Sequence, residues 1–350
     1  MKAATFFSVP FLILVISCNV PGKTEERAQA IGNGQMPDVA GDDAGNLYVV
    51  YGNGDSILYA SSYDGGKTYS QPSLVGILPE LAASHMRGPQ IAVTATGINI
   101  TAGNTAGDIF LYNKEKKGGW LPAYKLNDVD TVAKEGLMDL YADGNTVFAV
   151  WLDLRDGHNK IFGVGSADGG KTWAKNKLVY ASPDATVCEC CKPSVFVKGR
   201  QIYVMFRNWL NGNRDLYLIQ SDNSGENFGE AKKLGAGNWA LNGCPMDGGG
   251  ISVQDNGVVQ TVWRRQNKIY TCEPGKEEKE IGVGKGCTVT LVNNQPVYSW
   301  AEKGEVICLL PASRKVLGKG RSSVIKPVAK DKVACIWENE NRIYSEIISL

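Results

Sequence analysis

Short apolar runs, separated by turn residues, recur along almost the whole chain. In each recurring unit, a first apolar run is followed by a turn rich in Gly, Asn or Asp, a second run that often ends in an aromatic residue, a polar loop and a third run. Short apolar runs bounded by such turns predict β-strands. Seven units can be counted, at residues 38–61, 89–112, 137–166, 193–221, 248–272, 287–309 and 322–347.

The repeat predicts one β-propeller. The second runs end at Tyr51, Trp151, Phe206, Trp263, Trp300 and Trp337, and the last three of these are each 37 residues apart. A period of this length, with several short strands per unit, is typical of propeller blades. We therefore expect an all-β fold, a single propeller of four-stranded blades over residues 31–350, with seven blades by the repeat count and six as the alternative. Residues 27–34 are available as the outer strand that closes the last blade.

A shorter motif follows the third run of two units. It reads S-x-D-x-G-x-T-aromatic, and its structural residues are Ser62, Asp64, Gly66 and Tyr69 in one copy and Ser166, Asp168, Gly170 and Trp173 in the other. A weaker copy carries Ser221, Asn223, Gly225 and Phe228. The Asp carboxylate can accept backbone N–H groups, Gly supplies a positive φ, and the aromatic ring can pack beneath the turn. The motif therefore predicts a self-contained turn that stabilises the fold.

The composition agrees with many tight turns between short strands, and the net charge is too small for an extended basic or acidic surface. The chain has 41 glycines in 350 residues, 43% hydrophobic residues and 21% charged residues, which fits a folded globular protein. Lys and Arg number 37 against 36 Asp and Glu. We expect no nucleic-acid partner, because an extended anionic polymer requires a basic surface, and we expect a monomer.

The N-terminus predicts export. Lys2 is followed by an uncharged stretch, residues 3–17, that ends just before Cys18. This run is too short for a spanning helix and typical of a signal peptide. The sequence Val15-Ile16-Ser17-Cys18 resembles a bacterial lipobox. The resemblance implies a signal peptide at 1–17, lipidation of Cys18, a tether at 18–30 and a lipid-anchored protein of the bacterial cell envelope that contacts the membrane only through this anchor. A plain secretory signal is the alternative.

Blade topology predicts that the unusual polar residues share one face. Because the strands of a blade alternate in direction, the loops before the inner strands and after the second strands lie together, opposite the Asp-containing turns. We call this the mouth face. Its loops carry Arg87, Arg155, Arg207, Arg214, Arg264 and Arg265. Guanidinium groups suit carboxylates and phosphates, so these arginines predict an anionic ligand.

Three carboxylates of the mouth face are candidate catalytic residues: Glu135, Asp139 and Asp247. Glu135 and Asp139 could act as a general acid and its partner. Alternatively, each could hydrogen-bond the end of a loop. Single arginines on polar loops are also commonly solvated, and Asp153 could simply hold Arg155 in place.

Five cysteines also fall on the mouth face: Cys188, Cys190, Cys191, Cys244 and Cys287. In an oxidising compartment they could form one or two disulfides, including a vicinal bond between Cys190 and Cys191. They could instead bind copper or zinc through thiolates, or have a redox role. Spacing alone does not decide the connectivity. Cys272, Cys308 and Cys335 lie inside predicted strands and are expected to be buried thiols or a structural bridge.

Several stretches together carry a resemblance to a known group. They are residues 151–155 (WLDLR), 186–195 (TVCECCKPSV), 242–249 (NGCPMDGG) and 263–265 (WRR), with Arg207-Asn208 and Arg214-Asp215. Together with the two S-x-D-x-G-x-T-aromatic motifs, which resemble the Asp box of this superfamily, these stretches resemble exported bacterial BNR-repeat proteins of the sialidase-like β-propeller superfamily. This group is commonly labelled exo-α-sialidase. The resemblance spans residues 36–337.

That resemblance implies a glycoside hydrolase of exo-α-sialidase type. Sialidases grip the carboxylate of sialic acid with three arginines, for which Arg87, Arg207 and Arg264 are the candidates, and they use an Asp, a Glu and a Tyr for the chemistry. Arg87 is followed by Gly88-Pro89, where the family has Ile-Pro. Three hypotheses follow: recognition of an acidic glycan, which the protein could also hydrolyse; a non-catalytic binding or assembly propeller; and a protein that handles copper or zinc.

Overall fold

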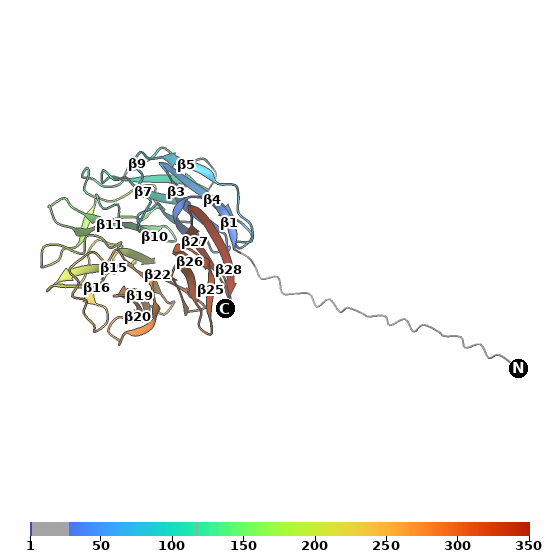
Figure 1. The fold of residues 1–350 in the computed structure, drawn as a ribbon. Helices are drawn as coiled ribbons and strands as arrows, with labels where there is room; N and C mark the ends of the chain where they lie inside the picture. Colours follow the sequence, from blue (N-terminus) through green and yellow to red (C-terminus); the bar gives the residue numbers. More distant parts are fainter. Residues whose placement is uncertain (2–27, 117) are drawn as a thin grey trace.

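The computed structural model describes Met1, residues 28–116 and residues 118–350. Apart from Met1, the predicted signal peptide of residues 1–17 lies outside the described residues, as do Cys18 and the tether up to residue 27. The described residues form seven four-stranded antiparallel sheets and no helix. Figure 1 shows these sheets arranged around one axis. The predicted all-β, seven-bladed propeller is therefore confirmed, and the six-bladed alternative is wrong.

Each blade runs from an inner strand at the axis to an outer strand at the rim. The first blade consists of β2 (Gln35–Gly41), β3 (Leu47–Asn53), β4 (Ser56–Ser62) and β5 (Ser73–Ile77). The second consists of β6 (Gln90–Val93), β7 (Gly97–Gly103), β8 (Ile109–Glu115) and β9 (Tyr124–Lys125). The third consists of β10 (Met138–Asp143), β11 (Thr146–Asp153), β12 (Lys160–Ser166) and β13 (Lys177–Tyr180).

The remaining blades follow the same order. The fourth consists of β14 (Ser194–Lys198), β15 (Gln201–Leu210), β16 (Asn213–Ser221) and β17 (Lys232–Lys233). The fifth consists of β18 (Gly249–Val253), β19 (Val259–Arg265), β20 (Lys268–Cys272) and β21 (Lys279–Val283). The sixth consists of β22 (Lys285–Val292), β23 (Gln295–Glu302), β24 (Glu305–Leu309) and β25 (Arg314–Lys319).

The seventh blade joins the two ends of the described chain. It contains β26 (Arg321–Ala329), β27 (Lys332–Asn339), β28 (Arg342–Ser349) and, as its outer strand, β1 (Gln29–Asn33). Gln29 pairs with Ser345, and Asn33 pairs with Arg342. This is the closing strand predicted at residues 27–34, and it begins inside the segment predicted as tether. Pairing of the first strand with the last closes the ring without a free sheet edge at this junction.

Hydrophobic side chains fill the spaces between neighbouring blades. The second strands are packed on both faces, so residues 47–52 of β3 are all buried. Trp151, Trp300 and Trp337 of the second strands β11, β23 and β27 are almost completely buried. Trp151, for example, lies in one cluster with Ala92 and Ile109 of the preceding blade. Burial on both faces explains why these runs are continuously apolar instead of alternating.

The two complete Asp boxes form the same hydrogen bonds on the face opposite the mouth. The N–H of Thr68 donates to Asp64 Oδ1 at 2.9 Å, and its hydroxyl donates to Asp64 Oδ2 at 2.6 Å. Thr172 makes the same two bonds to Asp168 at the same distances. These bonds lower the pKa of each Asp to about 2, because they favour the ionised carboxylate.

The Asp-box turns also pack against the preceding blade. A Cβ atom built at Gly170 would lie 1.8 Å from Asn99 Oδ1 of β7, and one at Gly66 would lie 2.4 Å from Ile347 of β28. Both glycines have positive φ, 84° at Gly66 and 90° at Gly170. Glycine is therefore required at these positions for its backbone conformation and for the close approach.

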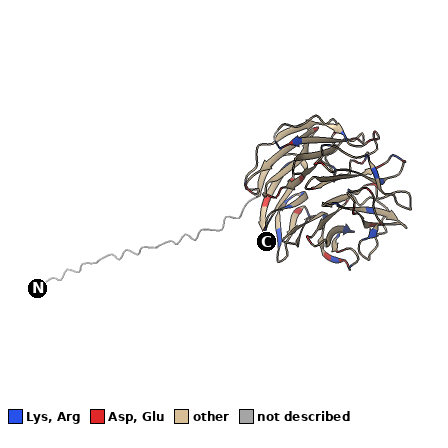
Figure 2. Ribbon diagram, turned by 180° about the vertical axis from the view of Figure 1, so that it is seen from behind, with Lys and Arg blue, Asp and Glu red and all other residues tan. Residues whose placement is uncertain are grey.

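Charge is distributed around the ring. Figure 2 shows Lys and Arg interspersed with Asp and Glu over the blades, in agreement with the net charge of +1. Among residues 28–116 and 118–350, no helix is long and apolar enough to cross a membrane.

Candidate functional site

A cavity of about 440 Å³ lies along the inner strands, and we call it the axial cavity. This volume is within the range of small-molecule sites. Its lining includes the basic residues Lys192, Arg264, Lys285, Arg321 and Lys326 and the acidic residues Asp38, Asp139 and Asp247. Basic side chains outnumber acidic ones, which favours an anionic occupant.

The three aspartates of the axial cavity connect neighbouring blades. One carboxylate oxygen of each accepts a hydrogen bond from a backbone N–H of the next inner strand. The pairs are Asp38 with Ile91 at 2.9 Å, Asp139 with Val195 at 2.8 Å, and Asp247 with Gly286 at 3.2 Å. Asp139 and Asp247, which the sequence marked as candidate catalytic residues, therefore hold the ring of inner strands together.

Basic side chains neutralise two of these aspartates. Lys192 Nζ lies 3.0 Å from Asp139 Oδ1, and Arg264 Nε lies 3.0 Å from Asp247 Oδ2. Burial raises the pKa of Asp247 above its usual range, although Arg264 and Arg207 oppose this shift. A raised pKa suits a general acid, but the oxygen that faces Arg264 is the same one that holds Gly286.

The predicted first arginine of the sialidase triad is bound to its own neighbours. Arg87 donates through Nη2 to Glu135 Oε2 at 3.0 Å, through Nε to the Glu135 carbonyl, and through Nη1 to the His85 carbonyl at 3.2 Å. The exposed fractions of the Arg87 and Glu135 side chains are 21% and 32%. The structure therefore brings a candidate arginine and a candidate acid together as a partly exposed ion pair.

Arg155 and Arg265 are also paired. Arg155 Nε and Nη2 donate to the two carboxylate oxygens of Asp153 at 2.9 Å each, and Nη1 lies 3.2 Å from Asp128. Arg265 Nη1 donates to Glu278 Oε2 at 2.9 Å, and Nη2 donates to Oε1. Two parallel bonds of this kind occupy the guanidinium fork that would otherwise hold a ligand carboxylate.

The remaining arginines bind backbone carbonyl groups. Arg207 is 2% exposed and donates to the carbonyls of Arg214 and Arg264 at 2.8 Å each. Arg264 donates to the Pro245 carbonyl at 2.7 Å. Arg214 lies over the Trp209 ring, 4.0 Å from its centroid. All six predicted ligand-binding arginines therefore have partners within the protein.

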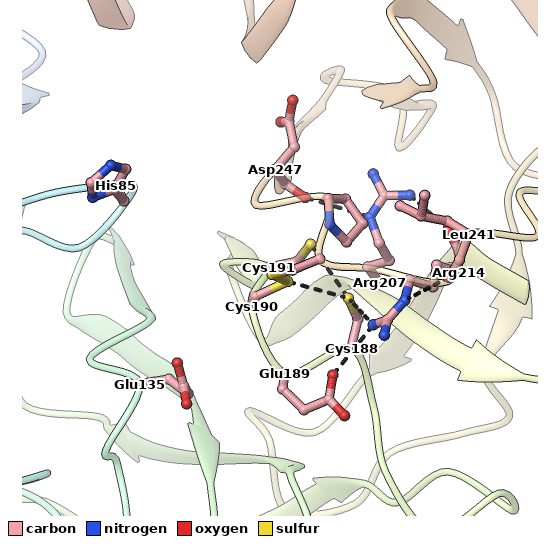
Figure 3. Close-up of a disulfide and its surroundings, with 12 residues drawn as sticks. His85, Glu135, Cys188, Glu189, Cys190, Cys191, Arg207, Arg214, Leu241 and Asp247 are labelled. Carbon is pink, nitrogen blue, oxygen red and sulfur yellow. Dashed lines mark hydrogen bonds and ion pairs between the residues drawn. A yellow bond between two sulfur atoms is a disulfide. The ribbon is translucent and has the colours of Figure 1, made fainter.

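The cysteines at the boundary between the fourth and fifth blades form a compact group. Cys190 is bonded to Cys244 as a disulfide. The sulfur of Cys188 lies 3.6 Å from that of Cys191 and 4.0 Å from that of Cys190 (Figure 3). A disulfide is thus confirmed at the mouth, but the vicinal Cys190–Cys191 bond considered from the sequence is not formed, because Cys190 pairs with the neighbouring loop. We call Cys188, Cys190, Cys191 and Cys244 the cysteine cluster.

Arginine charges act on this cluster. Arg214 Nη1 donates to the Cys188 sulfur at 3.0 Å and lies 3.3 Å from Glu189 Oε2. The hydrogen bond with Cys191 and the charges of Arg214 and Arg207 lower the pKa of Cys188 to about 6. Burial raises the pKa of Cys191. Of the two thiols, Cys188 is therefore the one that loses its proton more readily.

Cys287 and the strand cysteines are separate from the cluster. Cys287 is buried at the start of β22 and lines the axial cavity. Cys272, Cys308 and Cys335 are free, buried thiols, as expected for a small apolar side chain inside a strand. The sequence-level alternative of a bridge among these three cysteines is therefore wrong.

Two lysines of the axial cavity were missed from the sequence. Lys285 begins β22, and Lys326 lies in β26 with its ammonium 4.4 Å from the centroid of the Tyr141 ring. Neither lysine forms an ion pair with a described residue. No motif marks them, because isolated lysines in strands normally face solvent. Their charges act at longer range on Asp247 and Asp38, respectively, beside a cavity whose arginines are already engaged in closer contacts.

Backbone strain also collects at the mouth. Met36, His85, Met86 and Met246 all line the axial cavity and have φ values of 51°, 50°, 70° and 46°. Residues other than Gly rarely adopt this conformation, and in folded proteins it is concentrated at functional sites.

The fold can be compared with solved structures. The GH93 α-L-arabinofuranosidase of Fusarium graminearum, solved with arabinobiose, aligns with a TM-score of 0.54 and 12% identity over 92% of this chain and 97% of that one. A protein of unknown function from Dyadobacter fermentans aligns with a TM-score of 0.50 and 14% identity over 93% and 96% of the two chains. The chain has a sialidase-like propeller fold.

Trypanosoma rangeli sialidase aligns at 12% identity with a TM-score of 0.50, over 82% of this chain and 54% of the sialidase. No protein-family model matches the chain, and no curated protein matches it. The predicted relationship to the sialidase-like propellers is therefore confirmed at the level of the fold, since identities this low carry no information about activity.

Proposed function

We propose that the protein is a carbohydrate-binding propeller that holds an acidic sugar, of sialic-acid or uronic-acid type, in the axial cavity. The observation that carries this proposal is that Lys285 and Lys326, which form no ion pair with a described residue, line a cavity of about 440 Å³ with an excess of basic side chains. A carboxylate that reached either ammonium group would gain charge-assisted hydrogen bonds.

The proposal separates binding from hydrolysis. A glycoside hydrolase needs two carboxyl groups that flank the bond to be broken. The side chain of Glu135 is 32% exposed, but those of Asp139 and Asp247 are 16% and 2% exposed and connect neighbouring inner strands. We therefore expect no release of 4-methylumbelliferone from a sialic-acid glycoside above the rate of the Glu135→Gln variant. A higher rate would assign hydrolysis to the mouth face.

Calorimetric titration with N-acetylneuraminic acid and glucuronic acid, with glucose as the neutral control, tests binding. Losing charge-assisted hydrogen bonds costs on the order of 1.5 kcal/mol or more, so Lys285→Gln combined with Lys326→Gln should weaken Kd at least about tenfold. Lys330→Gln, in the exposed turn between β26 and β27 on the opposite face, is the matched control and should leave Kd unchanged. Equal affinity for glucose would contradict the proposal.

A further inference from the structure

The cysteine cluster is a second chemical centre on the mouth face. Its four residues are absent from the lining of the axial cavity. They come from two loops, one before β14 and one before β18, so the cluster joins the fourth and fifth blades. Nothing in the proposed binding of a sugar uses these sulfurs.

The sulfur positions suit a metal ion. The donor atoms of Cys188, Cys190 and Cys191 all lie within 4.8 Å of one another, and the two shortest separations that involve Cys188 are 3.6 Å and 4.0 Å. A metal ion with metal–sulfur bonds of about 2.3 Å in tetrahedral geometry separates its sulfur ligands by about 3.8 Å. These three sulfurs therefore need only small movements to surround one ion, and Cys244 can join them once its bond to Cys190 is open.

The charges around the cluster suit thiolates. Arg214 donates directly to the Cys188 sulfur at 3.0 Å, and Arg207 lies nearby, almost fully buried. Figure 3 shows both side chains beside the sulfurs, whereas His85 and Glu135 lie on separate loops. Several thiolates around one cation leave a net negative charge. Two guanidinium groups compensate that charge, which would otherwise be costly to bury.

The four cysteine residues differ in exposure. Cys188, Cys190 and Cys191 are 0%, 9% and 2% exposed, whereas Cys244 is exposed. A dithiol reductant from solution therefore reaches the disulfide at the Cys244 sulfur. Its thiolate attacks that sulfur, and Cys190 leaves as a thiolate and takes up a proton. The second thiol of the reductant then displaces Cys244, so that two electrons enter the protein and the reductant becomes a disulfide.

We infer that the cysteine cluster binds a soft, thiophilic metal ion, Cu(I) or Zn(II), and that the Cys190–Cys244 disulfide controls the site. With the disulfide closed, the cluster offers two thiols, Cys188 and Cys191. Opening the disulfide supplies the third and fourth sulfur ligands, and the metal displaces their protons into water. This inference is independent of the proposed sugar site.

The test is anaerobic titration of the full chain, carrying Cys18→Ser, with Zn(II) and with Cu(I) in competition with a chelator. Native mass spectrometry then reports the metal content. With a phosphine reductant we expect about one bound ion of at least one of the two metals. Without reductant, affinity should be at least about tenfold weaker. Cys244→Ser should bind without reductant, because Cys190 can no longer be held by its partner.

Cys191→Ser should lower the affinity of the reduced protein at least about tenfold, and Cys272→Ser, a buried strand cysteine, should change nothing. Tryptophan fluorescence checks that each variant is folded. If Cys191→Ser does not fold, the test rests on Cys244→Ser, because residue 244 is exposed and its substitution should not disturb folding. Absence of metal binding by the reduced chain, equal binding by folded Cys191→Ser, or unchanged dependence of Cys244→Ser on reductant would each overturn the inference.

Discussion

The Asp-box face and the mouth face of the propeller differ in sequence: the first carries a repeated motif, and the second carries loops that differ from blade to blade. On the Asp-box face, Asp64 and Asp168 make the same bonds to Thr68 and Thr172 at the same distances. On the mouth face, almost every loop is unique. A motif that recurs with the same bonds serves the fold in each blade that carries it, whereas departures from the repeat show where a single blade does something that the others do not.

The mouth face differs also in how it uses charge. Several of its arginines form ion pairs within the protein, such as Arg87 with Glu135 and Arg265 with Glu278. The groups to which we assign function are Lys285, Lys326 and the cysteine cluster. A conspicuous residue type is therefore not a guide to a ligand site until its partners are known.

The largest expected effect is a loss of stability from a substitution on the Asp-box face. Gly170→Ala places a Cβ atom 1.8 Å from Asn99 Oδ1 and requires alanine at a φ of 90°. Together these should lower the free energy of unfolding by about 2–4 kcal/mol. Chemical denaturation measures this change. Gly54→Ala, whose Cβ meets nothing within 4 Å at a φ of 56°, should cost only about 1 kcal/mol. Equal costs would show that the packing of the turn against the preceding blade is unimportant.

Arg87→Ala tests whether the mouth face grips a carboxylate as a sialidase does. Since Arg87 is paired with Glu135 at a partly exposed position, its loss should lower stability by no more than about 1 kcal/mol. The affinity for N-acetylneuraminic acid should stay within about twofold of the unchanged protein. A loss of binding of a hundredfold would restore Arg87 to the ligand site.

The smallest expected effect is on the pH dependence of stability in acid. Asp64 and Asp168 have pKa values of about 2 in the folded protein, below their ordinary value in the unfolded chain. Their contribution to stability is therefore complete above about pH 4 and is lost as the pH falls towards 2. Unfolding monitored between pH 5 and pH 2 should be less pH-dependent in the Asp64→Asn, Asp168→Asn double variant. An unchanged slope would mean that other carboxylates dominate.

The sequence predicted the fold well because the repeat is local. The seven units, the buried aromatic ends of the second strands and the closing strand at residues 27–34 each depend on neighbouring residues or on counting. The collection of arginines and cysteines on one face also followed, because strand direction alternates within each blade.

Partners were not predictable in the same way. Cys190 and Cys244 are 54 residues apart and belong to loops of adjacent blades. Arg87 and Glu135, which form a hydrogen bond, also lie on loops of two adjacent blades. Such pairs depend on the relative positions of loops, which spacing does not encode. The two lysines were missed for the opposite reason: they stand alone in the sequence, and only the packing of β22 and β26 at the axis gives them a role.

The most direct test of the division between the two faces is parallel calorimetry and thermal unfolding of two variants, Lys285→Gln with Lys326→Gln, and Gly170→Ala. The first should lose binding of N-acetylneuraminic acid and keep its Tm, because it changes the axial cavity alone. The second should keep its Kd below its lowered Tm, because it changes only the packing of an Asp-box turn. Unchanged Kd in the lysine variant, or lost binding in folded Gly170→Ala, would contradict the account.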